Sequence, residues 1–176
     1  MNQSFNMLER LIIIMAMRKE AFNQDVRKAD NHMTVTKEEL IEQLNVDLSH
    51  EYGAAIQYSY SASVVSGIYR SALKSFFEEE IEDELGHALY LSNKIKALGG
   101  VPTTKAAEVP QPEDVKGILE AVLEAESDTI VRYEKRMKQA EELGLTELAT
   151  TLEDMIKDET GHKEEVERLL LDERFK

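Results

Sequence analysis

Apolar residues recur at the three- and four-residue spacing of an amphipathic helix along most of this chain. The pattern predicts four helices, which cover approximately residues 36–67, 71–99, 114–143 and the segment from 146 onward. The first opens with Thr36-Lys37-Glu38-Glu39, which has the form of a capping box, and Thr146 can cap the fourth. Glycines follow the second and third stripes, as expected at helix ends. The expected fold is therefore an all-α four-helix bundle.

The link between the second and third helices is unusually long. Residues 100–112 contain all three prolines of the chain, so we interpret them as a connection and not as an element. Antiparallel helices that are neighbours need only a few linking residues. We therefore expect a crossover that runs the length of the bundle.

Residues 1–32 precede the bundle, which we assign to residues 33–176 as one domain. The apolar run Leu11–Met17 is too short to span a bilayer, and it lacks the basic segment and cleavage site of a signal peptide. Two interpretations stay open. The segment is either an additional helix that docks on a partner subunit, or an upstream extension with Met33 as the true start of the domain.

Charged residues interrupt each apolar stripe at a position where burial is expected. A carboxylate is costly to bury unless it is paired or bound to a metal, so these residues are the informative ones. They are Glu51 in the first helix, Glu84 and His87 in the second, Glu126 in the third, and Glu159 and His162 in the fourth.

One short phrase occurs twice, as Asp83-Glu84-Leu85-Gly86-His87 and as Asp158-Glu159-Thr160-Gly161-His162. In each, Glu and His are three residues apart and so share one helix face. The offset of 75 positions between the phrases also relates Glu51 to Glu126 and Tyr58 to Tyr133. The chain therefore consists of two related helix pairs that face each other across a pseudo-twofold axis. The recurring glycines suggest close helix approach beside the site.

The ligand set that these helices offer is that of a two-metal site. Four carboxylates can neutralise two divalent ions, and one imidazole for each ion favours iron or manganese over softer metals. A purely structural network of buried ion pairs is the alternative, although several carboxylates without a cation would repel one another.

Composition narrows the functional classes. The 176 residues carry 35 acidic and 21 basic side chains, a formal net charge of -14, which attracts cations and disfavours direct nucleic-acid binding. The chain has no cysteine, which excludes disulfides, thiolate metal sites and a rubredoxin-like centre. We expect no membrane span, and a cytoplasmic location is compatible with the absence of cysteine.

With these motifs, residues 36–172 resemble the ferritin-like superfamily of diiron-carboxylate proteins, in particular its bacterioferritin and rubrerythrin branch. The resemblance implies that Glu84 and Glu159 bridge two iron ions. It makes Glu51 and Glu126 terminal carboxylates and His87 and His162 nitrogen ligands. Tyr58 falls where bacterioferritins have a tyrosine close to the centre, which suggests a catalytic role, although ordinary core packing also explains it.

The sequence departs from both named relatives. Leu85 stands where bacterioferritins have a haem-ligating methionine, so no haem is expected. Little chain follows His162, where bacterioferritins carry a fifth helix, so we expect a smaller assembly than their large cage. Rubrerythrins have a further glutamate where Thr129 and Ile130 stand here, and they carry a cysteine-rich domain.

The resemblance implies a ferroxidase that binds two ferrous ions and oxidises them with dioxygen or peroxide, serving iron handling or detoxification in a homo-oligomer, a dimer or larger. A rubrerythrin-like peroxidase or a manganese catalase with the same centre is one alternative. A non-enzymatic iron-storage or scaffold oligomer is the other.

Overall fold

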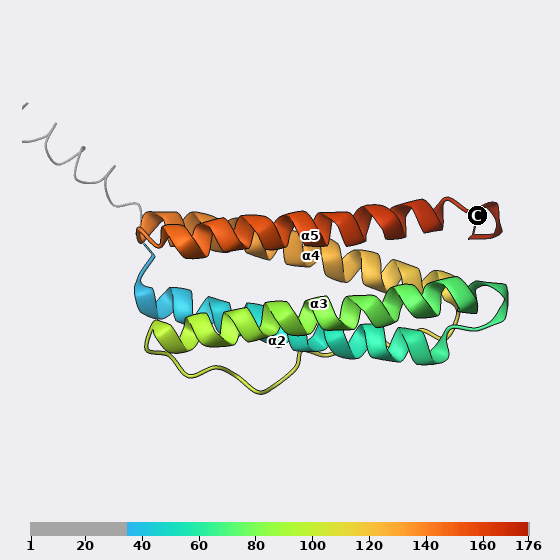
Figure 1. Cartoon of the computed structure of the whole chain (residues 1–176), viewed down its shortest axis with the longest axis horizontal. Helices are drawn as coiled ribbons and strands as arrows, with labels where there is room; N and C mark the ends of the chain where they lie inside the picture. The colour runs from blue at the N-terminus through green and yellow to red at the C-terminus, as the bar shows by residue number, and fades with distance from the viewer. Residues whose placement is uncertain (1–34, 176) are drawn as a thin grey trace, which may run out of the picture. The chain divides into compact units, whose positions relative to one another are not determined.

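The computed structural model describes residues 35–175, which form a four-helix bundle (Figure 1). The elements are α2 (Lys37–Val64), η1 (Gly67–Tyr69), α3 (Arg70–Ala97), α4 (Val115–Glu142), α5 (Thr146–Leu170) and η2 (Glu173–Phe175). The predicted all-α bundle is confirmed, whereas the extension proposed for residues 1–32 lies outside the described residues. Within residues 35–175, no helix combines the length and apolarity needed to cross a membrane.

The predicted capping box begins the first helix. The backbone N–H of Thr36 donates to Glu39 Oε2 at 2.8 Å, and the N–H of Glu39 donates to Thr36 Oγ1 at 3.2 Å. These reciprocal bonds satisfy two amides that the helix leaves without a partner. Asp114 similarly caps α4 by accepting from the Gly117 N–H at 2.9 Å.

The junction between α4 and α5 differs in one detail from the prediction. Gly144 adopts a φ of +70° and ends α4 as expected. Thr146 does not cap α5, because it is already the first helical residue. The capping position is Leu145, which has no side-chain oxygen to offer.

The helices form two antiparallel pairs, α2 with α3 and α4 with α5, and α2 also packs against α4. The connection between α3 and α4 runs from one end of the bundle to the other, as predicted (Figure 1). It is held against α2 by three hydrogen bonds, one of which Asn45 Nδ2 donates to the Val101 carbonyl at 3.2 Å. The Thr103 N–H donates to Asn45 Oδ1 and the Ala107 N–H donates to the Ser49 carbonyl, each at 2.7 Å.

The apolar core is divided into two clusters. The first is formed by Leu40, Leu44, Leu48, Ala88, Leu91, Ile95, Tyr133, Ala140, Leu148, Ala149, Leu152 and Met155. The second is formed by Tyr58, Ala62, Val65, Leu73, Phe77, Ile118, Leu119, Val122 and Val166. Both clusters draw residues from all four helices, so each ties one helix pair to the other. Burial of these side chains supplies most of the driving force for the bundle.

A buried ion pair that the sequence did not suggest joins α2 to α4. Arg136 Nε donates to Asp47 Oδ2 at 2.5 Å, and Arg132 Nε lies 3.7 Å from Asp47 Oδ1. Asp47 is fully buried and Arg136 is nearly so. Removing one partner would leave the other charge buried and unpaired, which is far more costly than losing a surface pair.

We expect Asp47→Ala to lower the free energy of unfolding of the metal-free protein by roughly 3–5 kcal/mol, because Arg136 would lose its buried partner. Denaturant titration followed by circular dichroism measures the change. Glu120→Ala is the matched control, since it removes an acid from the exposed pair with Lys116 on α4 and should cost less than about 1 kcal/mol. Equal losses in the two variants would contradict the importance of the buried pair.

Candidate metal centre

Four carboxylates lie between the two apolar clusters, one from each long helix. Glu51 comes from α2, Glu84 from α3, Glu126 from α4 and Glu159 from α5, and none is more than 2% exposed. Each stands on the apolar stripe of its helix, so packing of the stripes carries the four acids inward together. The structure therefore places the predicted carboxylates in one buried layer.

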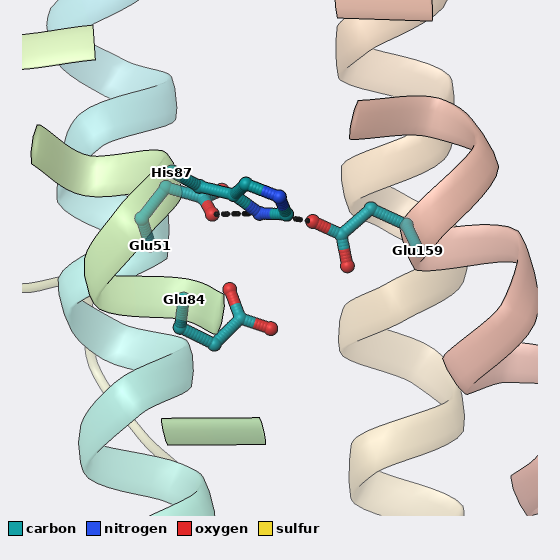
Figure 2. Close-up of side chains that lie close together, drawn as sticks. All are labelled: Glu51, Glu84, His87 and Glu159. Carbon is teal, nitrogen blue, oxygen red and sulfur yellow. Dashed lines mark ion pairs between the residues drawn. The ribbon is translucent and has the colours of Figure 1, made fainter. Parts of the chain in front are cut away.

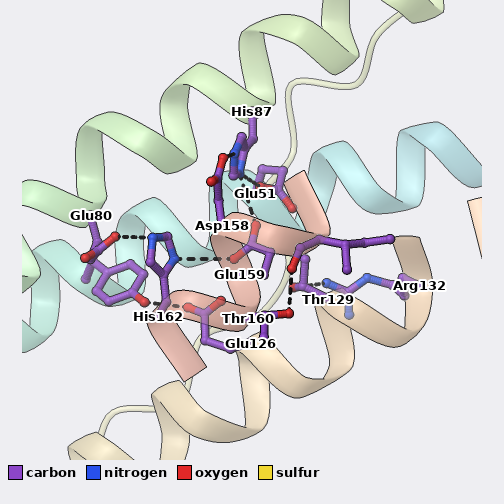
Figure 3. A network of polar contacts seen from close by, with 12 residues as sticks. Glu51, Glu80, His87, Glu126, Thr129, Arg132, Asp158, Glu159, Thr160 and His162 are labelled. Carbon is purple, nitrogen blue, oxygen red and sulfur yellow. Dashed lines mark hydrogen bonds and ion pairs between the residues drawn. The ribbon is translucent and has the colours of Figure 1, made fainter. Parts of the chain in front are cut away.

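His87 directs Nδ1 toward this layer (Figure 2), and His162 does the same (Figure 3). His87 Nδ1 lies 3.0 Å from Glu159 Oε1 and 3.4 Å from Glu51 Oε2. His162 Nδ1 lies 3.5 Å from Glu159 Oε2. Two atoms that each lie about 2.1 Å from one ion are roughly 3.0–3.4 Å apart at octahedral or tetrahedral angles. The spacing thus suits ligands of a shared ion.

The six side chains form two overlapping groups of possible metal ligands. One group contains Glu51, Glu84, His87 and Glu159, and the other contains Glu84, Glu126, Glu159 and His162. In each group, one ligand atom from every residue lies within 4.8 Å of the others. Glu84 and Glu159 belong to both groups, which is the position that a bridging carboxylate requires.

Many polar atoms of this layer lack a hydrogen-bond partner within the described part of the chain. They include Glu51 Oε2, Glu84 Oε1, both carboxylate oxygens of Glu159, and Nδ1 of both His87 and His162. Buried polar atoms in native proteins nearly always have a partner. The unpartnered atoms are oxygen and imidazole nitrogen donors that converge on one place, so the residues present fit a pair of hard or borderline divalent ions.

The carboxyl groups are held in unequal protonation states. Burial raises the pKa of Glu51, and it raises those of Glu84 and Glu126 well above the ordinary value. Burial also acts to raise the pKa of Glu159, but contacts with His162 and His87 outweigh it and lower that pKa. Carboxyl groups with raised pKa values therefore retain protons, which metal ions can replace on binding.

The imidazoles are held in their charged form. Burial by itself lowers the pKa of His87, but contacts with Glu159 and Glu51 outweigh it and raise the pKa to about 10. The pKa of His162 is also raised to about 10, by Glu159 and then Glu80 against the effect of burial. A metal ion must displace these protons, because a ligating imidazole has to be neutral at Nδ1.

The two related tyrosines reach toward the carboxylates of the opposite helix pair. Tyr58 on α2 is 1% exposed and donates its hydroxyl proton to Glu126 Oε1 on α4 at 2.5 Å. Burial, followed by the nearby charge of Glu126, raises the Tyr58 pKa well above its ordinary value. Tyr133 on α4 is fully buried, but its hydroxyl has no hydrogen-bond partner among the described residues. The Tyr58 hydroxyl therefore bonds to a predicted ligand, whereas the Tyr133 hydroxyl lies near Glu51 without an aligned hydrogen bond in the described part of the chain.

Glu80 is a site residue that the sequence analysis missed. It stands in a run of acids on α3 whose other members, Glu78, Glu79 and Glu82, are exposed to solvent. Glu80 is only 8% exposed, and its Oε2 lies 2.7 Å from His162 Nε2 (Figure 3). Its position one helical turn before Glu84 is the signal that could have revealed it.

The two glycines of the repeated phrase do not allow the close helix approach that their recurrence suggested. Gly86 and Gly161 are both exposed, and a Cβ atom added at either would meet no atom within 4 Å among the described residues. The Glu and His of each phrase point inward, and the glycine between them falls on the outer side of the helix.

Sequence comparison identifies relatives of this chain. Residues 41–175 match the family described as "Ferritin-like domain". The chain is 31% identical over 127 residues to a bacterioferritin of Desulfovibrio desulfuricans, and this alignment covers 72% of the chain and 71% of the relative.

Solved structures agree with this result. A ferritin-like diiron-carboxylate protein from Bacillus anthracis is 59% identical with a TM-score of 0.75, over 76% of this chain and 96% of that one. A dodecameric thioferritin from Bacteroides fragilis, described as bacterioferritin-related, is 27% identical with a TM-score of 0.72, over 79% and 88% of the respective chains.

The raised pKa values predict that the metal-free protein loses stability as pH rises. Protonated His87 and His162 contribute fully below pH 6.5, their ordinary pKa, and this contribution is lost as the pH rises through about 10. Glu84 and Glu126 act in the same direction, because they must ionise while buried. We expect the Tm of metal-free protein to fall between pH 6.5 and 10, by roughly 2–4 °C for each kcal/mol lost.

Thermal unfolding at several pH values, with and without saturating Mn²⁺, measures this effect. The ion replaces the imidazole protons, so its stabilisation should increase with pH. Glu159, whose pKa is lowered, would reverse the slope only below its ordinary value of 4.5, outside this interval. A metal-free Tm that stays constant or increases from pH 6.5 to 10 would contradict the prediction.

Proposed function

This chain belongs to the ferritin-like domain family, and we propose that its buried carboxylate layer binds two ferrous ions and oxidises them with dioxygen or hydrogen peroxide. The convergence of Glu51, Glu84, Glu126, Glu159, His87 and His162 into two overlapping ligand groups is the observation that carries the proposal. The bacterioferritin relative and the diiron-carboxylate structure support iron as the metal. Manganese would suit the same oxygen and imidazole ligands.

Each residue has a proposed role. Glu84 and Glu159 belong to both ligand groups and would bridge the ions, while Glu51 and Glu126 would each hold one ion from the side. Four carboxylates balance the charge of two divalent ions once the imidazole protons have left. Binding therefore replaces the buried protons of the metal-free layer by metal charge and removes the repulsion between the acids.

Oxidation uses one electron from each ferrous ion. Two ferrous ions and one dioxygen, with two protons, give two ferric ions and one hydrogen peroxide, and peroxide as oxidant takes the same two electrons. The site's carboxylates would stabilise the higher charge of the ferric products, because buried anions interact strongly with nearby cations. The acidic surface implied by the net charge of -14 would draw ferrous ions toward the protein.

Tyr58 is proposed to act beside the metals. Its hydroxyl bonds to Glu126, so it can hold that carboxylate in place and supply a proton or an electron during oxidation. Its aromatic ring also packs against Phe77 in the second apolar cluster, at a centroid distance of 6.0 Å. The role in oxidation therefore has to be separated from the role in packing by experiment.

We also propose that the protein is a homo-oligomer. A relative with the same fold is dodecameric. Several large apolar side chains on the outer side of α2 and α3 are exposed, including Ile56, Leu85 and Leu89. A face of this kind is typical of a surface that a partner covers.

Ferrous ions counted by anaerobic titration, followed by admission of air, test the proposal. We expect wild-type protein to oxidise about two ferrous ions rapidly per chain, as the ligand set requires. Glu84→Ala removes a shared ligand and should abolish both paired binding and the rapid phase. Glu153→Ala, which removes an exposed acid from α5, is the control and should behave like wild type.

Other results would favour different functions. Continued uptake far beyond two ions per chain would indicate storage, and peroxide consumption beyond the bound metal would indicate a peroxidase or catalase. A rapid phase unchanged in Glu84→Ala would contradict the proposed centre.

Tyr58→Phe should bind two ferrous ions but oxidise them more slowly, by up to roughly tenfold. A tenfold change in rate corresponds to about 1.4 kcal/mol, which is comparable to the loss of the hydrogen bond from Tyr58 to Glu126. Stopped-flow absorbance under single-turnover conditions measures the rate. Tyr133→Phe is a matched control, because the Tyr133 hydroxyl has no hydrogen-bond partner in the described structure. Equal rates in the two variants would assign Tyr58 to packing alone.

A further inference from the structure

We propose that Glu80 positions His162 as a metal ligand, so that the two metal positions are unequal and the one that includes His162 binds its ion more tightly. This inference rests on the proposed dinuclear centre. It concerns a residue outside the six ligands, and it distinguishes two positions that the repeated sequence would otherwise make equivalent.

His162 contacts carboxylates through both of its ring nitrogens, with one nitrogen facing the carboxylate layer and the other facing Glu80. Glu80 Oε2 lies 2.7 Å from Nε2, the nitrogen on the far side of the ring, while Nδ1 faces Glu159 (Figure 3). A carboxylate at Nε2 keeps the proton on that nitrogen, which leaves the Nδ1 lone pair free for the metal. Glu80 is only 8% exposed, so water competes little for the contact.

The corresponding contact at His87 is much weaker. His87 Nε2 lies 3.8 Å from Asp158 Oδ2, and the Asp158 side chain is 56% exposed. The offset of 75 positions that relates the two halves places Met155 where Glu80 would have its counterpart. Met155 is an apolar residue of the first cluster and cannot accept a hydrogen bond as a carboxylate does. The two histidines therefore differ in their support although they share a motif.

A third cation held by Glu80, Asp83 and His162 is the competing explanation. These residues each have a ligand atom within 4.8 Å of the others. However, Glu80 Oε2 and His162 Nε2 form an ion pair at 2.7 Å, which is shorter than the roughly 3.0 Å between neighbouring ligands of one ion, although Glu80 Oε2 makes no aligned hydrogen bond among the described residues. Asp83 is also exposed. The contact is therefore better explained as one between Glu80 and the imidazole itself.

Calorimetric titration of the metal-free full chain with Co²⁺ tests the inference without relying on oxidation. Wild-type protein should bind two ions with different affinities. Glu80→Gln should weaken one of them by about 10–100-fold, the usual effect of losing a carboxylate behind a ligating histidine. Asp158→Asn and the exposed neighbour Glu79→Gln should each change both affinities by less than about threefold.

Nuclear magnetic resonance of wild-type protein gives a second test that does not depend on how a variant folds. With labelled histidines and the diamagnetic ion Zn²⁺, the first equivalent should shift Nδ1 of His162 before Nδ1 of His87. The His162 ring should carry its proton on Nε2. In Glu80→Gln this order of filling should be lost.

The outcomes separate the two proposals. Fewer than two Co²⁺ ions bound by wild type would overturn the proposed dinuclear function. Two ions bound by wild type, with unchanged affinities in Glu80→Gln or with His87 filled first, would overturn only the role of Glu80. A third Co²⁺ ion lost in Glu80→Gln would also overturn that role and would assign Glu80 to a separate cation site.

Discussion

The structure depends on placing four carboxylates in the interior of an apolar bundle. Such a layer is costly without positive charge, because each acid must be desolvated and each repels its neighbours. The pKa values of Glu84, Glu126 and the two histidines are raised, so these side chains retain protons when no metal is bound. The retained protons reduce the negative charge of the layer. The ligand set, the protonation states and the unpartnered polar atoms all follow from the burial of these four carboxylates.

Much of the fold and of the candidate site could be predicted from sequence, because the relevant signals are local or periodic. The capping box at Thr36 is confirmed atom by atom, and the apolar stripes give the four helices. The six ligand candidates could be identified because a charge on an apolar stripe is conspicuous. The repeated phrase then pairs these charges across the molecule.

The features that escaped prediction depend on contacts between helices. Glu80 stands in a run of acids on α3, and only the approach of His162 from α5 distinguishes it from its solvated neighbours. The Asp47–Arg136 pair likewise joins residues 89 positions apart, with no repeat or motif to indicate it. The prediction for Gly86 and Gly161 was wrong for a different reason. Both glycines do belong to the repeated phrase, but they lie on the outer side of their helices, where they contact no neighbouring helix of the described structure.

The division of the core into two apolar clusters has a consequence for cooperativity. A continuous core makes a domain unfold as one unit, whereas here a polar layer separates the two ends. The four helices run through both clusters and couple them, but buried charge in the layer between the clusters destabilises the middle of the bundle. Ions that bind ligands from all four helices would join the two ends into a single cooperative unit. In this bundle, therefore, a bound metal would strengthen the coupling between the two ends of the core.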